Sequence, residues 1–108
     1  MSWAEAFAVT QLCEVPIYAL ALRPRPVARR LLIGFGASAL THPVVWFVFP
    51  VLVHGYWLMV ACAEAFAVLA EAAYLDRFRV PHPLAWSLLA NATSVAVGLT
   101  MRALLHFP

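Results

Sequence analysis

The sequence predicts an all-α integral membrane protein, a four-helix bundle built from two repeated helical hairpins. Of the 108 residues, 65% are hydrophobic and only 11% are charged, which is more apolar surface than a water-soluble domain of this size can bury. Several apolar stretches are long enough to cross a hydrocarbon core about 30 Å thick, which takes about 20 helical residues. We therefore expect residues 1–108 to form a single membrane domain.

The predicted spans follow the apolar stretches in order along the chain. They cover residues 3–22, 30–49, 56–75 and 84–105. Strands of a membrane barrel alternate apolar and polar residues over about 10 positions, whereas these stretches are apolar on every face, which favours helices. The N-terminus carries Glu5 where a secretory signal has a basic region, so we expect the first span to be retained.

The arginines of the connectors predict the orientation. The connector RPRPVARR follows the first span and DRFRVPHP follows the third, whereas PVLVHGY, between the second and third spans, has no Arg or Lys. Because basic connectors stay on the cytoplasmic side, both termini are expected outside, in a multi-pass protein of the bacterial inner membrane. The arginines thus indicate topology: the lipid bilayer is an expected partner, and nucleic acid is not.

The second half of the chain resembles the first. The hexapeptide AEAFAV occurs at residues 4–9 and at 63–68, each time at the start of a predicted span. The matched polar residues are Glu14 with Glu71, Tyr18 with Tyr74, Ser38 with Asn91, and Thr41 with Ser94. Since both hairpins begin outside, they predict a parallel repeat related by a pseudo-twofold axis along the membrane normal. The alternative is chance similarity between alanine-rich segments.

Polar residues inside the spans predict a buried site. Counting about 1.5 Å per residue from the cytoplasmic ends places one polar layer roughly 7 to 12 Å deep and another roughly 15 to 18 Å deep. Carboxylates exposed to lipid at such depths would be costly, so these side chains are expected to meet inside the bundle. The candidate residues for binding an ion or ligand are Glu14, Thr41, His42, Glu64, Glu71, Asn91 and Ser94.

The segment ALTHPVVW places His42 beside a helix-breaking proline near the bilayer midplane. Pro43 leaves one backbone carbonyl without its helical donor, and the hydroxyls of Ser38 and Thr41 are its expected local partners. Glu64, at matching depth, is the expected hydrogen-bond partner of His42. These two side chains are also the candidate metal ligands, because one His and carboxylates can hold a zinc ion.

Small residues at four-residue spacing mark one face of the last span. Ala90, Ser94 and Gly98 lie on this face. Faces of this kind allow helix backbones to approach closely in lipid, so we expect this face to pack tightly against a neighbouring helix.

Three classes of function fit these features. The preferred hypothesis is a proton- or cation-linked transport or ion-binding protein that holds a cation or metal ion and assembles as a homodimer or within a larger membrane complex. The first alternative is a non-catalytic accessory subunit of a membrane complex. The second is an intramembrane metal- or carboxylate-dependent hydrolase or transferase. The sequence has no HExxH or GxSxG motif, so we assign no catalytic residue.

Overall fold

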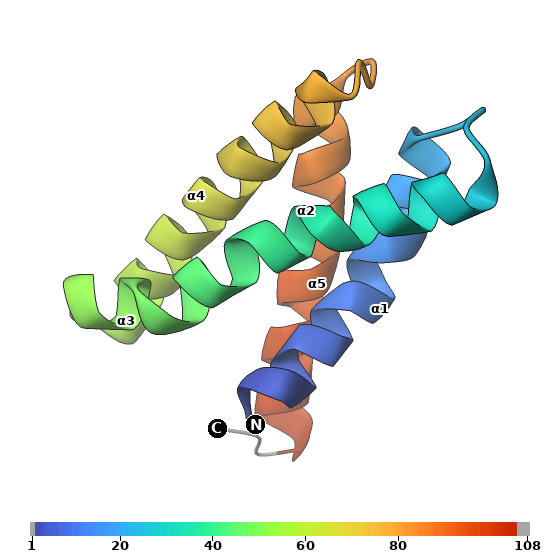
Figure 1. The fold of residues 1–108 in the computed structure, drawn as a ribbon. Helices are drawn as coiled ribbons and strands as arrows, with labels where there is room; N and C mark the ends of the chain where they lie inside the picture. Colours follow the sequence, from blue (N-terminus) through green and yellow to red (C-terminus); the bar gives the residue numbers. More distant parts are fainter. Residues whose placement is uncertain (1, 106–108) are drawn as a thin grey trace.

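The computed structural model describes residues 2–105, which fold into helices joined by short connectors. The elements are α1 (Trp3–Ala21), α2 (Val27–Phe47), α3 (Phe49–Leu52), α4 (Tyr56–Arg77) and α5 (Pro83–Leu105). Figure 1 shows the long helices crossing one another at wide angles, with α3 as a short turn of helix between α2 and α4. No strand occurs in residues 2–105, so the all-α prediction is confirmed for this part of the chain.

Three helical segments are long and apolar enough to cross a membrane. They are Val27–Leu52, Tyr56–Arg77 and Pro83–Leu104, which correspond to the second, third and fourth predicted spans. Helix α1 falls outside this group, because Glu5, Gln11 and Glu14 lower its hydropathy. Helix α2 begins at Val27 rather than at residue 30, so Arg29 and Arg30 lie in its first turn.

The surface of the helices is apolar, as expected for helices that face lipid. Leu12, Leu32, Val51 and Leu104, from four different helices, are each more than two thirds exposed. A water-soluble protein rarely exposes apolar patches made of so many large side chains. Exposed leucines and buried acids together are the reverse of a soluble fold and typical of a membrane protein.

Helix α1 begins with a capping box. The amide of Glu5 donates to Ser2 Oγ at 3.1 Å, and the amide of Ser2 donates to Glu5 Oε1 at 2.9 Å. These bonds satisfy two backbone amides at the helix start that have no helical acceptor. Glu5 is exposed, and these contacts give it a structural role at the start of the helix. The sequence pattern S-x-x-E is typical of such a capping box.

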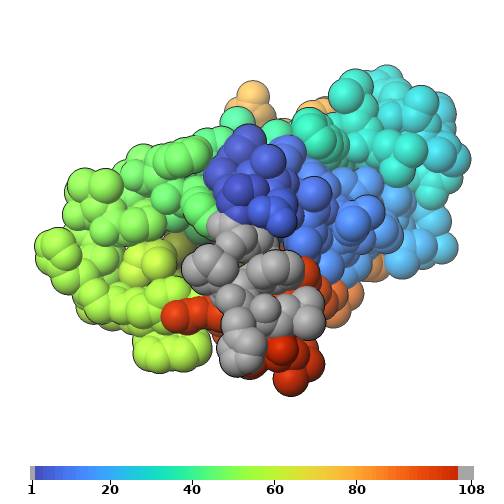
Figure 2. All heavy atoms as spheres, turned by 90° about the horizontal axis from the view of Figure 1, so that it is seen from below, coloured from blue at the N-terminus to red at the C-terminus, as the bar shows by residue number. Residues whose placement is uncertain are grey.

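The helices pack as a ring in which each long helix has two neighbours. Helix α1 contacts α2 and α5, and α4 contacts the same two helices. Figure 1 shows the connectors 22–26 and 78–82 at the upper right, and the start of α1, α3 and the end of α5 toward the lower left and bottom. We call these the connector end and the terminal end. Figure 2 views the molecule from below, with the first turns of α1 beside the end of α2.

The two arginine-containing connectors are bound to each other. The guanidinium of Arg25 donates to the carbonyl of Phe78 and, at 3.2 Å, to that of Leu22. Beneath them lies the apolar core, which is therefore at the connector end. The buried core residues are Tyr18, Ala21, Leu22, Ile33, Ala37, Leu75, Val80 and Ala90.

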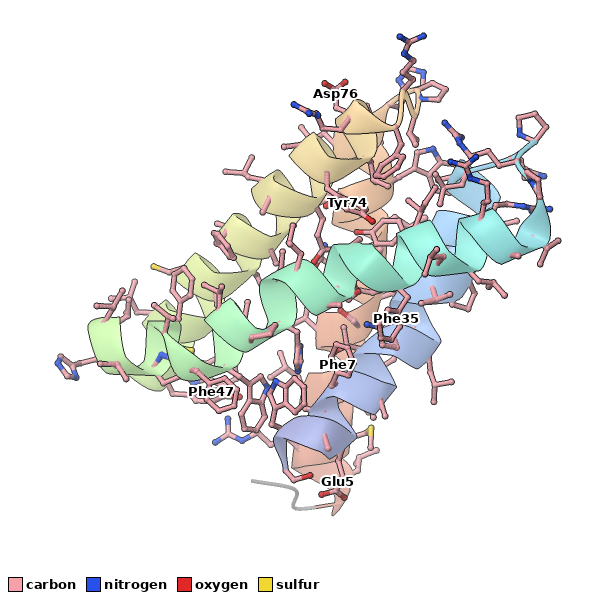
Figure 3. All side chains as sticks on the ribbon, viewed as in Figure 1. Glu5, Phe7, Phe35, Phe47, Tyr74 and Asp76 are labelled. Carbon is pink, nitrogen blue, oxygen red and sulfur yellow. The ribbon has the colours of Figure 1, made fainter. Side chains whose placement is uncertain are left out.

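The predicted close packing at Gly98 is wrong. A Cβ added at Gly98 would meet no atom within 4 Å, because this part of α5 faces a cavity. Close approach occurs instead on α2, where a Cβ at Gly34 would lie 3.3 Å from Tyr18 Cβ and one at Gly36 would lie 2.5 Å from Tyr74 Oη. Figure 3 shows Tyr74 on α4 beside α2. Its hydroxyl donates to the Ile33 carbonyl at 2.9 Å.

The change Gly36→Ala is expected to lower the free energy of unfolding by about 1 kcal/mol, because the new methyl group displaces the Tyr74 hydroxyl from the Ile33 carbonyl. Tyr74→Phe removes the same hydrogen bond and leaves only the ring carbon Cζ, at 3.4 Å from the added Cβ. In a Tyr74→Phe background, Gly36→Ala should therefore cost much less. Reversible unfolding in mixed micelles compares the wild type, the two single variants and the double variant. If the losses of unfolding free energy in the two single variants add up fully in the double variant, this account is contradicted.

Candidate functional site

Glu14 is buried among hydroxyl groups where three helices meet. Its side chain is 1% exposed. Ser38 Oγ of α2 donates to Glu14 Oε1 at 2.6 Å, and Ser94 Oγ of α5 donates to Oε2 at 2.6 Å. Each carboxylate oxygen of Glu14 thus accepts one short hydrogen bond from a neutral donor.

Glu71 is the second buried acid, and it connects α4 to the other long helices. Its side chain is 2% exposed. Oε1 accepts from Tyr18 Oη of α1 at 2.5 Å and from Asn91 Nδ2 of α5 at 3.1 Å, and Oε2 accepts from Thr41 Oγ1 of α2 at 2.6 Å. The Asn91 amide is itself fixed by a bond to the Ser87 carbonyl at 2.9 Å.

Both carboxylates are surrounded by neutral donors rather than by bases. Within residues 2–105, no Lys, Arg or His side chain hydrogen-bonds to Glu14 or Glu71. Hydroxyl and amide donors stabilise a negative charge but do not cancel it. A carboxyl group removed from water is therefore stable either with a proton bound or with a cation nearby. Carboxyl groups in such surroundings are chemically able to take up a proton or a cation.

A cavity of about 500 Å³ extends from the acid pair toward the terminal end. All four long helices line it, and its walls reach Tyr56 at the start of α4 and Arg102 near the end of α5. The Arg102 guanidinium lies 3.8 Å from the centre of the Tyr56 ring, a cation–π contact that joins these two helices. At the connector end the apolar core closes the bundle. The acids thus lie at the closed end of this cavity.

The predicted hydrogen bond between His42 and Glu64 is wrong in this structure. Both residues line the cavity, but His42 Nε2 is buried and has no hydrogen-bond partner among residues 2–105. The imidazole packs instead among aromatic rings, with centroid distances of 6.0 Å to Trp3, 5.3 Å to Phe7 and 6.3 Å to Trp46. His42 thus lies beside Trp3 and Phe7 at the start of α1, which depth counting along upright helices did not predict.

The predicted metal site lacks ligands. In the part of the chain that the structure describes, no group of three or more His, Cys, Asp or Glu side chains is placed to hold a metal ion. Zinc bound by protein takes three or four such ligands. Glu64 and His42 both line the cavity, but no third ligand among the described residues joins them.

Hydroxyl groups that the sequence did not assign to the site complete it. Tyr18 and Ser38 each donate to a carboxylate, although Ser38 was expected to serve the backbone near Pro43. Thr41 was a predicted site residue that was also expected to serve the backbone. Its short bond is to Glu71, whereas its contacts with backbone carbonyls are 3.4 and 3.5 Å long. The sequence feature that could have identified Ser38 as a site residue is the match of Ser38 and Thr41 in the first half with Asn91 and Ser94 in the second half.

No protein-family model, curated protein or solved structure matches the chain.

Proposed function

We propose that this membrane protein is a proton- or cation-linked transport protein whose coupling site is the acid pair Glu14 and Glu71. The observation that carries the proposal is the burial of both acids, without a basic partner, at the closed end of a cavity lined by all four long helices. Acids inside membrane spans are costly and commonly mark ion and proton pathways. Because neutral donors solvate each carboxylate, a proton and a cation can compete for the same groups.

The pattern of hydrogen bonds supports the proposed duplication of the hairpin. In order, Glu14 accepts from Ser38 and Ser94, and Glu71 from Asn91 and Thr41. Each acid thus takes the first matched donor of its own hairpin and the second matched donor of the other. A twofold rotation that exchanges the hairpins exchanges these two sets. The tyrosines depart from the pattern, because Tyr18 donates to Glu71 whereas Tyr74 donates to a backbone carbonyl. Repeats around a central site are common in transporters.

The proposal includes α1 as a fourth span, with both termini on the outer side of a bacterial inner membrane. Helix α1 has 19 residues and is therefore about 28 Å long at 1.5 Å per residue, close to the hydrocarbon thickness. Glu14 and Gln11 lower its hydropathy, but Glu14 is buried inside the bundle and is not exposed to lipid. The arginines of the two bonded connectors support the proposed cytoplasmic location of the connector end.

Cysteine labelling in intact cells tests this topology. In a background in which Cys13 and Cys62 are replaced by Ala, Ser2→Cys is expected to react with a membrane-impermeant maleimide added outside. Asp76→Cys, exposed near the connector end, should react only after the membrane is permeabilised. Labelling of Asp76→Cys in intact cells, or protection of Ser2→Cys, would contradict the proposed orientation.

Flux measurements in proteoliposomes test the proposed function. Vesicles that contain a pH-sensitive dye are given a Na⁺ gradient, a K⁺ gradient, or an inside-negative potential. Protein-containing vesicles should acidify or alkalinise faster than protein-free vesicles under at least one of these conditions, because protons and cations share the acid pair. Rates equal to those of protein-free vesicles under every condition, and under a gradient of any cation that the purified protein binds, would overturn the proposal if the protein is correctly folded.

A further inference from the structure

We infer that the cavity that extends from Glu14 and Glu71 toward the terminal end binds an organic ammonium ion with an apolar body; this inference rests on the function proposed above and names its substrate class. The first observation is the size of the cavity. Its volume, about 500 Å³, falls within the range of about 300 to 1,000 Å³ that is typical of small-molecule pockets. A site that served only protons or a bare inorganic ion would not require such a space beside its carboxylates.

The second observation is the apolar wall between the acids and the terminal end. It consists of aliphatic side chains from every long helix, together with the rings of Trp46 and Tyr56. The aliphatic residues are Val9, Val45, Met59, Val60, Val95 and Leu99. Such walls favour an apolar body, because an apolar group gives up no hydrogen bonds to water when it enters the cavity. A strongly hydrated inorganic ion would exchange its water for hydrocarbon. Aromatic faces also attract cations, and more so where water is excluded.

The third observation is the sign of the charge. Among the described residues that line the cavity, Glu14, Glu64 and Glu71 are acidic and Arg102 is the one Lys or Arg. The Arg102 guanidinium already contacts the Tyr56 ring at the far end of the cavity from the acid pair. An anionic ligand would therefore meet three carboxyl groups, whereas an ammonium group would supply the positive charge that the acid pair lacks.

The size of the cavity, its apolar wall and the sign of its charge thus point to one class of ligand, an organic ammonium ion with an apolar body.

Equilibrium binding to the purified protein in detergent tests this inference. The probe is benzyltrimethylammonium. Its controls are tetramethylammonium, which has the charge without the apolar body, and benzyl alcohol, which has the ring without the charge. Calorimetry or tryptophan fluorescence should give a Kd at least about tenfold lower for the probe than for either control, since only the probe uses both wall and acids. Equal affinity for benzyl alcohol would identify an uncharged apolar pocket and overturn the inference.

Two variants identify the cavity as the binding site. Gly98→Leu fills it from α5, where an added Cβ meets no atom within 4 Å, so the change should weaken probe binding at least about tenfold without lowering the melting temperature. The double variant Glu14→Gln, Glu71→Gln should weaken probe binding to a similar extent, because it removes the negative charge. Glu5→Gln is the matched control, because Glu5 lies outside the cavity lining and Gln also completes a capping box. Unchanged affinity in Gly98→Leu would place the probe elsewhere and reject the cavity as its site.

The two proposals fail separately. Proton flux coupled to Na⁺ or K⁺ without binding of benzyltrimethylammonium would reject the organic ligand and leave the proposed transport function intact. Probe binding that Gly98→Leu weakens, in vesicles that show no flux under any gradient including one of the probe itself, would support the ligand class and reject transport.

Discussion

Replacing both Glu14 and Glu71 by Gln is expected to reduce proton- or cation-linked flux by about two orders of magnitude, to the rate of protein-free vesicles. Glutamine has nearly the shape of glutamate but neither carries a charge nor releases a proton. The hydroxyl donors Ser38, Ser94 and Thr41 can rotate to accept from the new amide groups, so most of the network should persist. The double variant therefore separates the loss of acid chemistry from the loss of structure.

The single variants refine this expectation. Because Glu14 and Glu71 occupy matching positions in the proposed repeat, Glu14→Gln and Glu71→Gln should each lower the flux strongly. Glu64→Gln should have a smaller effect, since Glu64 lines the cavity but accepts no hydrogen bond from the described residues. Glu5→Gln should behave as wild type. If Glu64→Gln alone abolished flux while the double variant remained active, the assignment of the acid pair would be wrong.

Glu71→Ala is expected to lower the free energy of unfolding by about 3 kcal/mol, the largest stability effect of any single change proposed for this protein. Truncation leaves three buried donors, on Tyr18, Thr41 and Asn91, without their acceptor. Polar contacts between membrane helices are commonly worth about 0.6 kcal/mol each. The three unpaired groups and the new void together bring the loss to the larger figure.

Glu64→Ala is the matched control for this stability measurement. It removes the same number of atoms from the same helix and the same cavity wall, but it unpairs no donor within the described residues. Its cost should stay below about 1 kcal/mol. Unfolding in mixed micelles, followed by circular dichroism, compares the two variants. Equal costs would show that Glu71 contributes through its volume rather than through its hydrogen bonds.

Much of the helical architecture was predictable from the sequence. Long stretches that are apolar on every face predict helical spans, because a helix satisfies its backbone groups within the segment, and the last three agree with the structure to within a few residues. Helix α1 falls outside the group of apolar spans because of Glu5, Gln11 and Glu14, of which Glu14 is buried inside the bundle. The start of α2 was misplaced because Arg29 and Arg30 were assigned to a connector, although long basic side chains are readily accommodated at the end of a span.

The candidate site was predictable in composition but not in pairing. Depth along each helix predicted interior polar residues, and these residues line the cavity, yet depth counting paired Glu64 with His42 and placed Glu14 and Thr41 in different layers. Depth counting assumes upright helices, whereas here the helices cross at wide angles, and the crossing brings Ser94 to Glu14 and Thr41 to Glu71. Crossing angles depend on how the side chains of two facing helices fit together, and the residue pattern along one helix does not reveal this fit.

The sharing of donors between the two hairpins has a consequence for how the chain assembles. After insertion, the α1–α2 hairpin alone would offer Glu14 only Ser38, and the α4–α5 hairpin alone would offer Glu71 only Asn91. Each inserted hairpin would hold an acid and a hydroxyl donor that find their remaining partners only across the new interface. Lipid tails are as apolar as leucine side chains, so the burial of apolar surface provides little driving force for the two hairpins to associate. The last step of folding is therefore driven by the pairing of polar groups that would otherwise face hydrocarbon. The residues that join the two hairpins are thus the same residues that form the buried acid site.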